Sequence, residues 1–287
     1  MHNLNELAVH QYLDNVSTGK KTMSDTTIDN ICSDIKDALT KQFKRDKDYS
    51  FSMRMSNIGR PSCQLWFEKN KADKAIPKPT TFIMNMMIGD IIEAIFKGLL
   101  KESNVKFKNT DRVKLKINDD MNISGSYDLI IDNSVDDIKS ASDWSYKHKF
   151  ESYNSLKEKD AFGYVAQLAG YAKASNSDVG GWWVINKATG EFKYIPADID
   201  IEEEYKKIKD NVKTVENNEF KRCFEAQDEM FYGKPTGNKI LGINCSFCAF
   251  RYECWDNLKE LPSLVSQAKS PKTVSYVHIG EEYKHGK

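Results

Sequence analysis

The sequence has no run of about 20 consecutive apolar residues, the length that a membrane-spanning helix needs. Its first residues lack the cationic and apolar parts of a secretory signal peptide. Internal repeats and low-complexity linkers are absent as well, so the composition marks no boundary between domains. These absences predict a cytoplasmic protein with no membrane partner and a single domain over residues 49–287. Residues 1–48 are polar with weak helical periodicity, which predicts a helical lead-in.

The chain also lacks a net charge, because 42 Lys and Arg residues balance 42 Asp and Glu residues. It has no global positive field that would attract nucleic acid. Attraction for DNA would have to come from local groups of lysines, each of which could equally be a solvated surface. The candidate groups are Lys69, Lys71, Lys74 and Lys78, then Lys97, Lys101, Lys106 and Lys108, and finally Lys147 and Lys149.

The hydrophobic pattern predicts an α/β fold. Helical spacing of apolar residues is found in residues 82–100 and 159–174, and a charged surface helix is expected in residues 201–220. Short alternating or apolar runs predict strands, which fall in residues 112–117, 123–132 and 134–141 and on either side of a turn at 188–190. The predicted order is helix, three strands, helix, two strands, helix.

Two acidic residues and a lysine occur close together in the predicted strands. Asp128 ends the sequence Gly-Ser-Tyr-Asp, and nine residues later comes Asp137-Ile138-Lys139. Side chains two apart in a strand project from the same face, so Asp137 and Lys139 are expected to lie side by side. Carboxylates bind hard divalent ions such as Mg²⁺, and a nearby lysine can help to activate water. An exposed strand of mixed charge is the alternative interpretation.

The order of these motifs carries a resemblance. A helix with Glu93 comes first, then G-x-x-D and D-x-K, then a helix on which Gln167 and Tyr171 share one face. In this order the chain resembles the RecB family of PD-(D/E)XK nucleases. The resemblance implies a restriction-endonuclease-like core, with a mixed central sheet flanked by helices.

The resemblance also implies roles for individual residues. The implied ligands of Mg²⁺ or Mn²⁺ are the side chains of Glu93, Asp128 and Asp137 and the backbone carbonyl of Ile138. Lys139 would act in water activation, and Gln167 and Tyr171 would hold DNA or the lysine. Many family members have histidine where Glu93 stands, which leaves this ligand open. Glu93 and Gln167 could also be surface residues, and Tyr171 a core aromatic.

Six cysteines in a cytoplasmic chain are not expected to form structural disulfides. Cys245, Cys248 and Cys254 have the spacing C-x2-C-x5-C, and no second cysteine or histidine pair typical of zinc fingers follows. Cys63 is the best distant candidate for a fourth ligand. Cys32 and Cys223 are interpreted as ordinary thiols.

The cysteine pattern resembles a subset of RecB-like nucleases that includes the AddB nuclease domain and CRISPR-associated RecB-like exonucleases. In these proteins one cysteine before the nuclease core and three after it bind a [4Fe-4S] cluster. The resemblance implies the same role for Cys63, Cys245, Cys248 and Cys254, so that a cluster joins the N- and C-terminal segments. A zinc site with four thiolates and unligated buried cysteines are the alternatives. Aromatic residues near the cysteines are expected to shield the site or to stack on bases, namely Phe247, Phe250, Tyr252 and Trp255.

Together these features predict an Mg²⁺- or Mn²⁺-dependent deoxyribonuclease, an exonuclease on single-stranded DNA or duplex ends. Its role would be in recombination, repair or DNA processing, with recombination or replication proteins as partners. The high Lys and Asn content hints at an AT-rich genome, such as that of a phage or its host. The alternative is a catalytically weak DNA-binding subunit that keeps the nuclease fold and the cluster.

Overall fold

The computed structural model describes residues 3–44 and 51–281, so the boundary expected between residues 48 and 49 lies outside the described residues. The chain forms two compact units, each built from two segments. Unit 1 comprises Met1–Gly59 and Pro79–Asp210, and unit 2 comprises Arg60–Lys78 and Asn211–Lys287. The sequence analysis assigned residues 49–287 to one domain, whereas the structure divides them. One division falls inside a helix, which is why no linker composition marks it.

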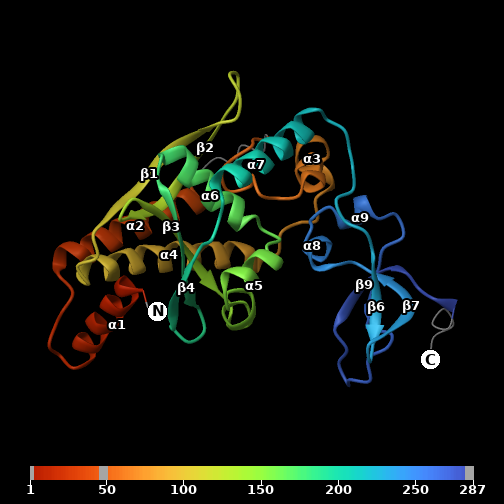
Figure 1. The fold of residues 1–287 in the computed structure, drawn as a ribbon. Coiled ribbons are helices and arrows are strands. Elements are labelled where there is room, and N and C mark those ends of the chain that lie inside the picture. The colour runs from red at the N-terminus through yellow and green to blue at the C-terminus, as the bar shows by residue number, and fades with distance from the viewer. Residues whose placement is uncertain (1–2, 45–50, 282–287) are drawn as a thin grey trace. The chain divides into compact units, whose positions relative to one another are not determined.

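Unit 1 contains a five-stranded sheet in the order β1-β2-β3-β4-β5 (Figure 1). The strands are β1 (Phe107–Lys116), β2 (Asn122–Ile131), β3 (Ser134–Ala141), β4 (Asp178–Asn186) and β5 (Phe192–Pro196). Only β3 and β4 pair in parallel, and the other neighbours are antiparallel. The expected mixed sheet and its three-strand meander are therefore confirmed.

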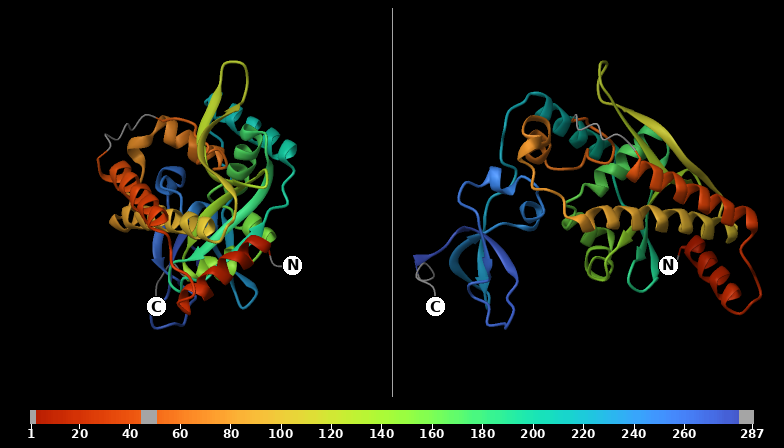
Figure 2. Two further views of the ribbon diagram at one scale, coloured as in Figure 1. Left: turned by 90° about the vertical axis from the view of Figure 1, so that its left-hand side faces the viewer. Right: turned by 180° about the vertical axis from the view of Figure 1, so that it is seen from behind.

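Helices cover both faces of this sheet. They are α1 (Leu4–Ser17), α2 (Asp25–Phe43), α4 (Thr80–Glu102), α5 (Tyr153–Glu158), α6 (Tyr164–Ser175) and α7 (Ile201–Glu216), whose last residues belong to unit 2. Helix α4 packs against β3, and α1 and α2 pack against α4 (Figure 2). Ile138 joins the core beneath α4, while the next residue, Lys139, reaches Tyr164 of α6. Because neighbouring strand residues point to opposite faces, α4 and α6 lie on opposite sides.

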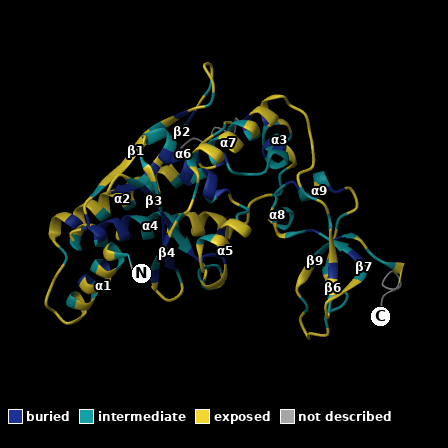
Figure 3. Cartoon of the chain, in the orientation of Figure 1, coloured by how far each residue is buried: buried dark blue, intermediate teal, exposed yellow. Residues whose placement is uncertain are grey.

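The core of unit 1 lies mainly between α4 and the central strands, which Figure 3 shows as the most buried part of the sheet. Phe96 and Leu100 of α4 belong to one buried cluster with Leu129, Ile138 and Trp183. This accounts for the apolar periodicity of residues 82–100 and confirms the long helix expected there. No helix among the described residues is long and apolar enough to cross a membrane.

Helix α6 begins later than the sequence pattern predicts. Its N-cap residue, Gly163, has a φ of 78°, a conformation that glycine adopts at little cost. The Asp160 carboxylate accepts hydrogen bonds from the backbone N–H groups of Tyr164 and Val165 at 2.9 Å each. A Cβ atom at Gly163 would lie 2.4 Å from the backbone of Gly59. The glycine therefore fixes where the helix starts and lets two backbone segments approach.

Unit 2 contains a second sheet that the sequence analysis did not predict. Its strands are β6 (Gln227–Phe231), β7 (Lys234–Ile240), β8 (Lys259–Pro262) and β9 (Thr273–His278), paired in the antiparallel order β6-β7-β9-β8. Helices α3 (Ser62–Asn70), α8 (Ile243–Ser246) and α9 (Arg251–Cys254) and the 3-10 turn η1 (Ala72–Lys74) complete the unit. The interior is partly polar, since Glu229 accepts hydrogen bonds from Asn238 and Tyr276. Short strands with polar interiors give weak sequence signals.

Asp136 is a buried structural carboxylate next to the predicted site residue Asp137. It accepts hydrogen bonds from the Gly181 N–H at 2.9 Å, the Trp183 indole at 3.0 Å and the Tyr194 hydroxyl at 2.9 Å. Burial raises the pKa of Asp136 to about 7, although all three donors favour the charged form. Asp136 thus ties β3 to β4 and β5 on the face opposite Asp137.

Asp136→Ala is expected to lower the free energy of unfolding by about 2 to 4 kcal/mol, because three donors lose their acceptor inside the protein. Urea unfolding followed by tryptophan fluorescence measures the change. Asp178→Ala, at an exposed position of β4, serves as the control and should change stability by less than about 0.5 kcal/mol. Equal effects of the two substitutions would contradict the structural role of Asp136.

Candidate active site and cysteine pocket

The candidate active site lies where β2 and β3 separate. The paired positions of these strands end at Leu129 and Asp136. One residue before Leu129 in β2, the Asp128 carboxylate accepts a hydrogen bond of 2.7 Å from the Ile138 N–H. A side chain thus takes the place of a backbone acceptor in the ladder. This contact brings the predicted G-x-x-D aspartate to the predicted D-x-K strand, which the sequence alone did not establish.

Asp137 and Lys139 lie side by side on β3, as strand alternation predicts. The Lys139 Nζ is 2.7 Å from Asp137 Oδ1 and 2.6 Å from Oδ2. Oδ2 is buried, and among the described residues it has this ion pair but no hydrogen bond. The Asp137 side chain is 5% exposed and that of Lys139 is 18% exposed. A buried acceptor of this kind is suited to a further cationic or hydrogen-bonding partner.

The acidic groups of the site influence one another. Burial raises the pKa of Asp128 to about 6, and the charge of Asp137 adds to this effect. Burial also raises the pKa of Asp137, against the opposing charge of Lys139. Burial disfavours the Lys139 ammonium, but the charges of Asp137 and Asp128 outweigh burial and raise the pKa of Lys139. Lys139 is therefore a cation held by two carboxylates.

Glu93 on α4 faces the same group of charges. Burial and then the charge of Asp128 raise the pKa of Glu93. The Lys97 Nζ lies 2.5 Å from the Glu93 carboxylate and donates to the Thr110 hydroxyl at 2.7 Å. Glu93 is thus near Asp128, as the family resemblance implied, and has a lysine partner that the sequence analysis counted only within a possible basic surface. The spacing of four residues on one helix was a signal for that pair.

Tyr171 and Gln167 of α6 border the site. Burial raises the pKa of Tyr171 to about 12, a hydrogen bond with Gln167 opposes this, and the charges of Asp137 and Asp128 add to it. A Cβ atom at Gly125 would lie 3.0 Å from the Tyr171 ring and 2.3 Å from Met55. The glycine of G-x-x-D therefore leaves room for the Tyr171 ring against β2. Tyr171 remains a phenol that can donate a hydrogen bond.

The site thus brings together the residues predicted in unit 1, which are Glu93, Asp128, Asp137, Ile138, Lys139, Gln167 and Tyr171. The Ile138 side chain lies in the core, and its backbone N–H donates a hydrogen bond to the Asp128 carboxylate. The sequence analysis missed Tyr164, whose ring lies 5.0 Å from the Lys139 Nζ. It considered Lys149 only as part of a possible surface patch, but this lysine is buried beside the same ring.

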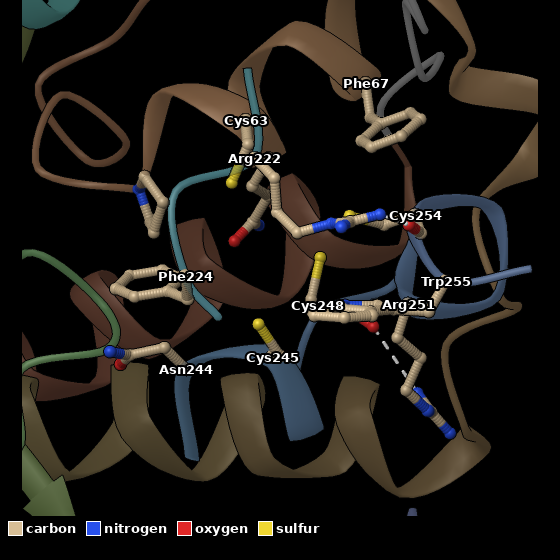
Figure 4. Close-up of a pocket in the computed structure, with 12 residues that line it drawn as sticks. Cys63, Phe67, Arg222, Phe224, Asn244, Cys245, Cys248, Arg251, Cys254 and Trp255 are labelled. Atoms are coloured by element: carbon tan, nitrogen blue, oxygen red, sulfur yellow. Dashed lines mark hydrogen bonds between the residues drawn. The ribbon is translucent and has the colours of Figure 1, made fainter. Parts of the chain in front are cut away.

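Four cysteines of unit 2 line one pocket, and Figure 4 shows Cys63, Cys245, Cys248 and Cys254 around the same space. Cys63 comes from α3, and the other three come from α8, α9 and the segment between them. Burial raises the pKa of Cys245 to about 11, and the neighbouring Cys254 and Cys248 raise it further. The fold of unit 2 therefore brings Cys63 to a run of cysteines that lies about 180 positions later in the sequence.

A fifth thiol adjoins this group. The sequence analysis interpreted Cys223 as an ordinary thiol, but its Sγ accepts a hydrogen bond of 3.1 Å from the Cys63 N–H and lies 3.3 Å from the Ser62 hydroxyl. The interaction with the Cys63 side chain and these contacts lower the pKa of Cys223 to about 6, against the effect of burial. The same pair interaction raises the pKa of Cys63. No spacing in the sequence marks this partnership.

The aromatic residues near the cysteines divide into two groups. Trp255 lines the pocket together with Phe67, and the Arg222 guanidinium lies 4.0 Å from the Trp255 ring centroid. Phe250 is buried and stacks on Phe67 at 5.3 Å. Phe247 is 71% exposed and Tyr252 is 46% exposed. The expectation that all four named aromatics shield the cysteines is therefore too broad.

Among residues 3–44 and 51–281, no group of three or more His, Cys, Asp or Glu side chains is arranged to hold a metal ion. The described residues therefore do not show a four-cysteine metal cluster joining the N- and C-terminal segments. The donor sets still fit the implied groups chemically. Buried carboxylates with raised pKa values suit a hard divalent ion, and four thiols around an apolar pocket suit iron or zinc.

Comparisons with known proteins do not indicate a function for this chain. No family model and no curated protein matches the chain. Among solved structures, the chain is similar to one titled "Crystal structure of SSO0001", with 14% sequence identity and a TM-score of 0.41. The match covers 80% of this chain and 96% of that chain. A likeness of this size carries no argument about activity.

Asp128→Asn is expected to raise the free energy of unfolding at pH 7.5 by on the order of 1 to 2 kcal/mol, allowing for solvent screening of a partly exposed group. The folded-state pKa of Asp128 is about 6 against an ordinary 3.8, so the charged form costs stability above pH 6. This cost disappears as the pH falls below 3.8, where both states are protonated. Asparagine keeps an acceptor for the Ile138 N–H.

Urea unfolding at pH 7.5 and near pH 4 measures this difference. Asp119→Asn is the control, because the Asp119 side chain is 94% exposed and should give no change at either pH. A variant at position 128 that is less stable than the wild type at pH 7.5 would show that the carboxylate stabilises the fold instead.

Proposed function

We propose that the protein is a metal-dependent DNA nuclease of the RecB-like PD-(D/E)XK type, acting as an exonuclease on single-stranded DNA or duplex ends. The observation that carries the proposal is the meeting of Asp128, Asp137 and Lys139 at the point where β2 and β3 separate. Burial raises the pKa of both Asp128 and Asp137, so their charged forms are costly to the fold, and such groups cluster at functional sites. Recombination, repair or DNA processing would be its setting.

The acids would hold the metal ion. Asp128, Asp137 and Glu93, with the carbonyl of Ile138, would bind Mg²⁺ or Mn²⁺, since these ions prefer oxygen ligands. Such an ion, when bound, stabilises negative charge on a phosphate and activates water for hydrolysis. Lys97 keeps Glu93 oriented through its ion pair and its hydrogen bond to Thr110.

Lys139 and Tyr171 would act on the DNA and the water. The Lys139 ammonium is charged at neutral pH, so it can orient a water and balance negative charge that develops on the phosphate. Tyr171 keeps its phenolic proton and can donate it in a hydrogen bond to a phosphate oxygen. Gln167 lies one turn from Tyr171 on α6 and would help to orient its hydroxyl.

A [4Fe-4S] cluster bound by Cys63, Cys245, Cys248 and Cys254 is part of the same proposal. Thiolates are the ligands that such clusters take, and a cluster would join the two segments that build unit 2. Arg222 and Arg251 line the pocket and would offset the negative charge of the thiolates. This cluster would stabilise the fold without taking part in hydrolysis.

Asp137→Asn and Lys139→Ala are each expected to reduce cleavage at least about 100-fold, the usual scale for losing an acid-base or charge-stabilising group. Release of label from end-labelled single-stranded and duplex DNA, with Mg²⁺, Mn²⁺ or EDTA, measures the rate. The matched control is the exposed pair Lys116 and Asp119, whose substitution should leave the rate unchanged.

Two outcomes would contradict this assignment. Cleavage at wild-type rate in Asp137→Asn would remove Asp137 from the site. Binding of DNA by the wild type without cleavage in either metal would favour the alternative function, a DNA-binding subunit that keeps the fold. The ion pairs of Glu93 and Asp137 with lysines are compatible with this alternative, since such pairs also occur in purely structural charge networks.

Cys245→Ser and Cys248→Ser are expected to lower the iron content of anaerobically purified protein and its broad absorption near ~400 nm, which arises from thiolate-to-iron charge transfer. Cys32→Ser, at an exposed cysteine of α2, is the control and should retain both. A colourless wild-type protein that contains zinc and no iron would show that the cysteines form a zinc site and not the proposed cluster. Equal metal content in all three variants would remove these cysteines from any metal site.

A further inference from the structure

Lys149 is a buried lysine that the proposed chemistry does not use. It is the last residue of η2 (Ser145–Lys149), a single π-helical turn, and it is 6% exposed. Its Nζ lies 4.2 Å from the ring centroid of Tyr164, 4.9 Å from that of Phe162 and 5.6 Å from that of Phe150. Such turns are rare and occur frequently at functional sites. The ammonium is therefore held between aromatic rings.

No carboxylate forms an ion pair with Lys149 among the described residues. Other buried or half-buried lysines of unit 1 have an oxygen partner, since Lys97 and Lys139 pair with carboxylates and Lys193 donates to the Tyr146 carbonyl. Burial lowers the pKa of Lys149 to about 8. The charge of Asp160 opposes this lowering, and the charge of Lys139 adds to it. Aromatic rings replace only part of the solvation that a buried cation loses. An anion is the partner that this environment lacks.

Lys149 also adjoins the candidate active site. Its Nζ and that of Lys139 both lie against the ring of Tyr164, at 4.2 Å and 5.0 Å. An anion at Lys149 would therefore be close to the acids and the lysine of the proposed nuclease centre. The ring of Phe162 stacks on Tyr164 at 5.8 Å and is 47% exposed, so a flat group could extend the stack.

We propose that Lys149 and Phe162 form a nucleotide subsite next to the cleavage site, in which Lys149 binds a backbone phosphate and Phe162 stacks on an unpaired base. The subsite rests on the proposed nuclease function and narrows its substrate to single-stranded DNA. Stacking on an aromatic side chain requires a base that is not paired within a duplex. A lysine that contacts a phosphate adds to the salt dependence of binding, whatever the sequence.

The test measures binding of fluorescent oligothymidylate, and of a duplex of the same length, to the full chain in EDTA over a series of salt concentrations. Lys149→Met should lower the slope of log affinity against log salt by roughly 0.7, the contribution of one phosphate contact to a single strand. Lys149→Arg should keep the slope. The matched control is Lys193→Met, because Lys193 lies at the same 4.2 Å from an aromatic ring but has an oxygen partner.

Phe162→Ala should weaken binding of the oligothymidylate by roughly 5- to 100-fold and leave duplex binding unchanged. Lys149→Met should melt at or above the wild-type temperature, since it removes a buried cation without an ion-pair partner. A lower melting temperature with an unchanged salt slope would make Lys149 a structural residue and overturn the subsite. Equal losses on duplex and single strand in Phe162→Ala would overturn the base contact.

The outcomes separate this inference from the nuclease proposal. Cleavage by the wild type, with a salt slope that Lys149→Met does not change, overturns the subsite alone. Binding that depends on Lys149, in a protein that cleaves no DNA with Mg²⁺ or Mn²⁺, overturns the nuclease and supports the subsite. Failure of the wild type to bind oligothymidylate overturns the subsite.

Discussion

The hydrogen bond from the Ile138 N–H to the Asp128 carboxylate determines the geometry of the candidate active site. It forms where the β2–β3 ladder ends, so the Ile138 N–H donates to a side chain of β2 instead of a backbone carbonyl. With Asp128 held there, the alternation of side chains along β3 determines which face of the sheet each neighbouring residue points to. Asp136 and Ile138 point toward one face and bind the strands together, while Asp137 and Lys139 point toward the other. A structural role and the proposed chemical role thus alternate along one strand.

Charge balance is the second constraint on this site. Besides burial, the charge of Asp137 raises the pKa of Asp128, and the charge of Asp128 raises that of Glu93. Lys139 and Lys97 offset part of this negative charge. Buried ion pairs seldom stabilise a fold as well as apolar packing would, because both partners lose their hydration. Such a network is more readily explained by chemistry than by folding. The same reasoning applies to any buried lysine near it that has no acid of its own.

Unit 2 depends on long-range contacts of a different kind. Its two segments lie far apart in the sequence, and its sheet has a partly polar interior around Glu229. A small unit buries a smaller share of its surface than a large one, so cross-links between distant segments have more influence on its stability. The meeting of Cys63 with the C-terminal cysteines around one pocket provides such a connection, whether through a metal or through thiol contacts.

The sequence by itself determined what depends on local periodicity. The α/β class, the strand meander, the long helix over residues 82–100 and the side-by-side placement of Asp137 and Lys139 all follow from spacing along the chain. The tertiary structure alone decided which distant groups meet. The partnership of Cys63 with Cys223, the aromatic surroundings of Lys149, the second sheet and the division into two units left no local pattern. Each depends on strand pairing and helix packing between segments far apart, and such contacts form only when the whole chain folds.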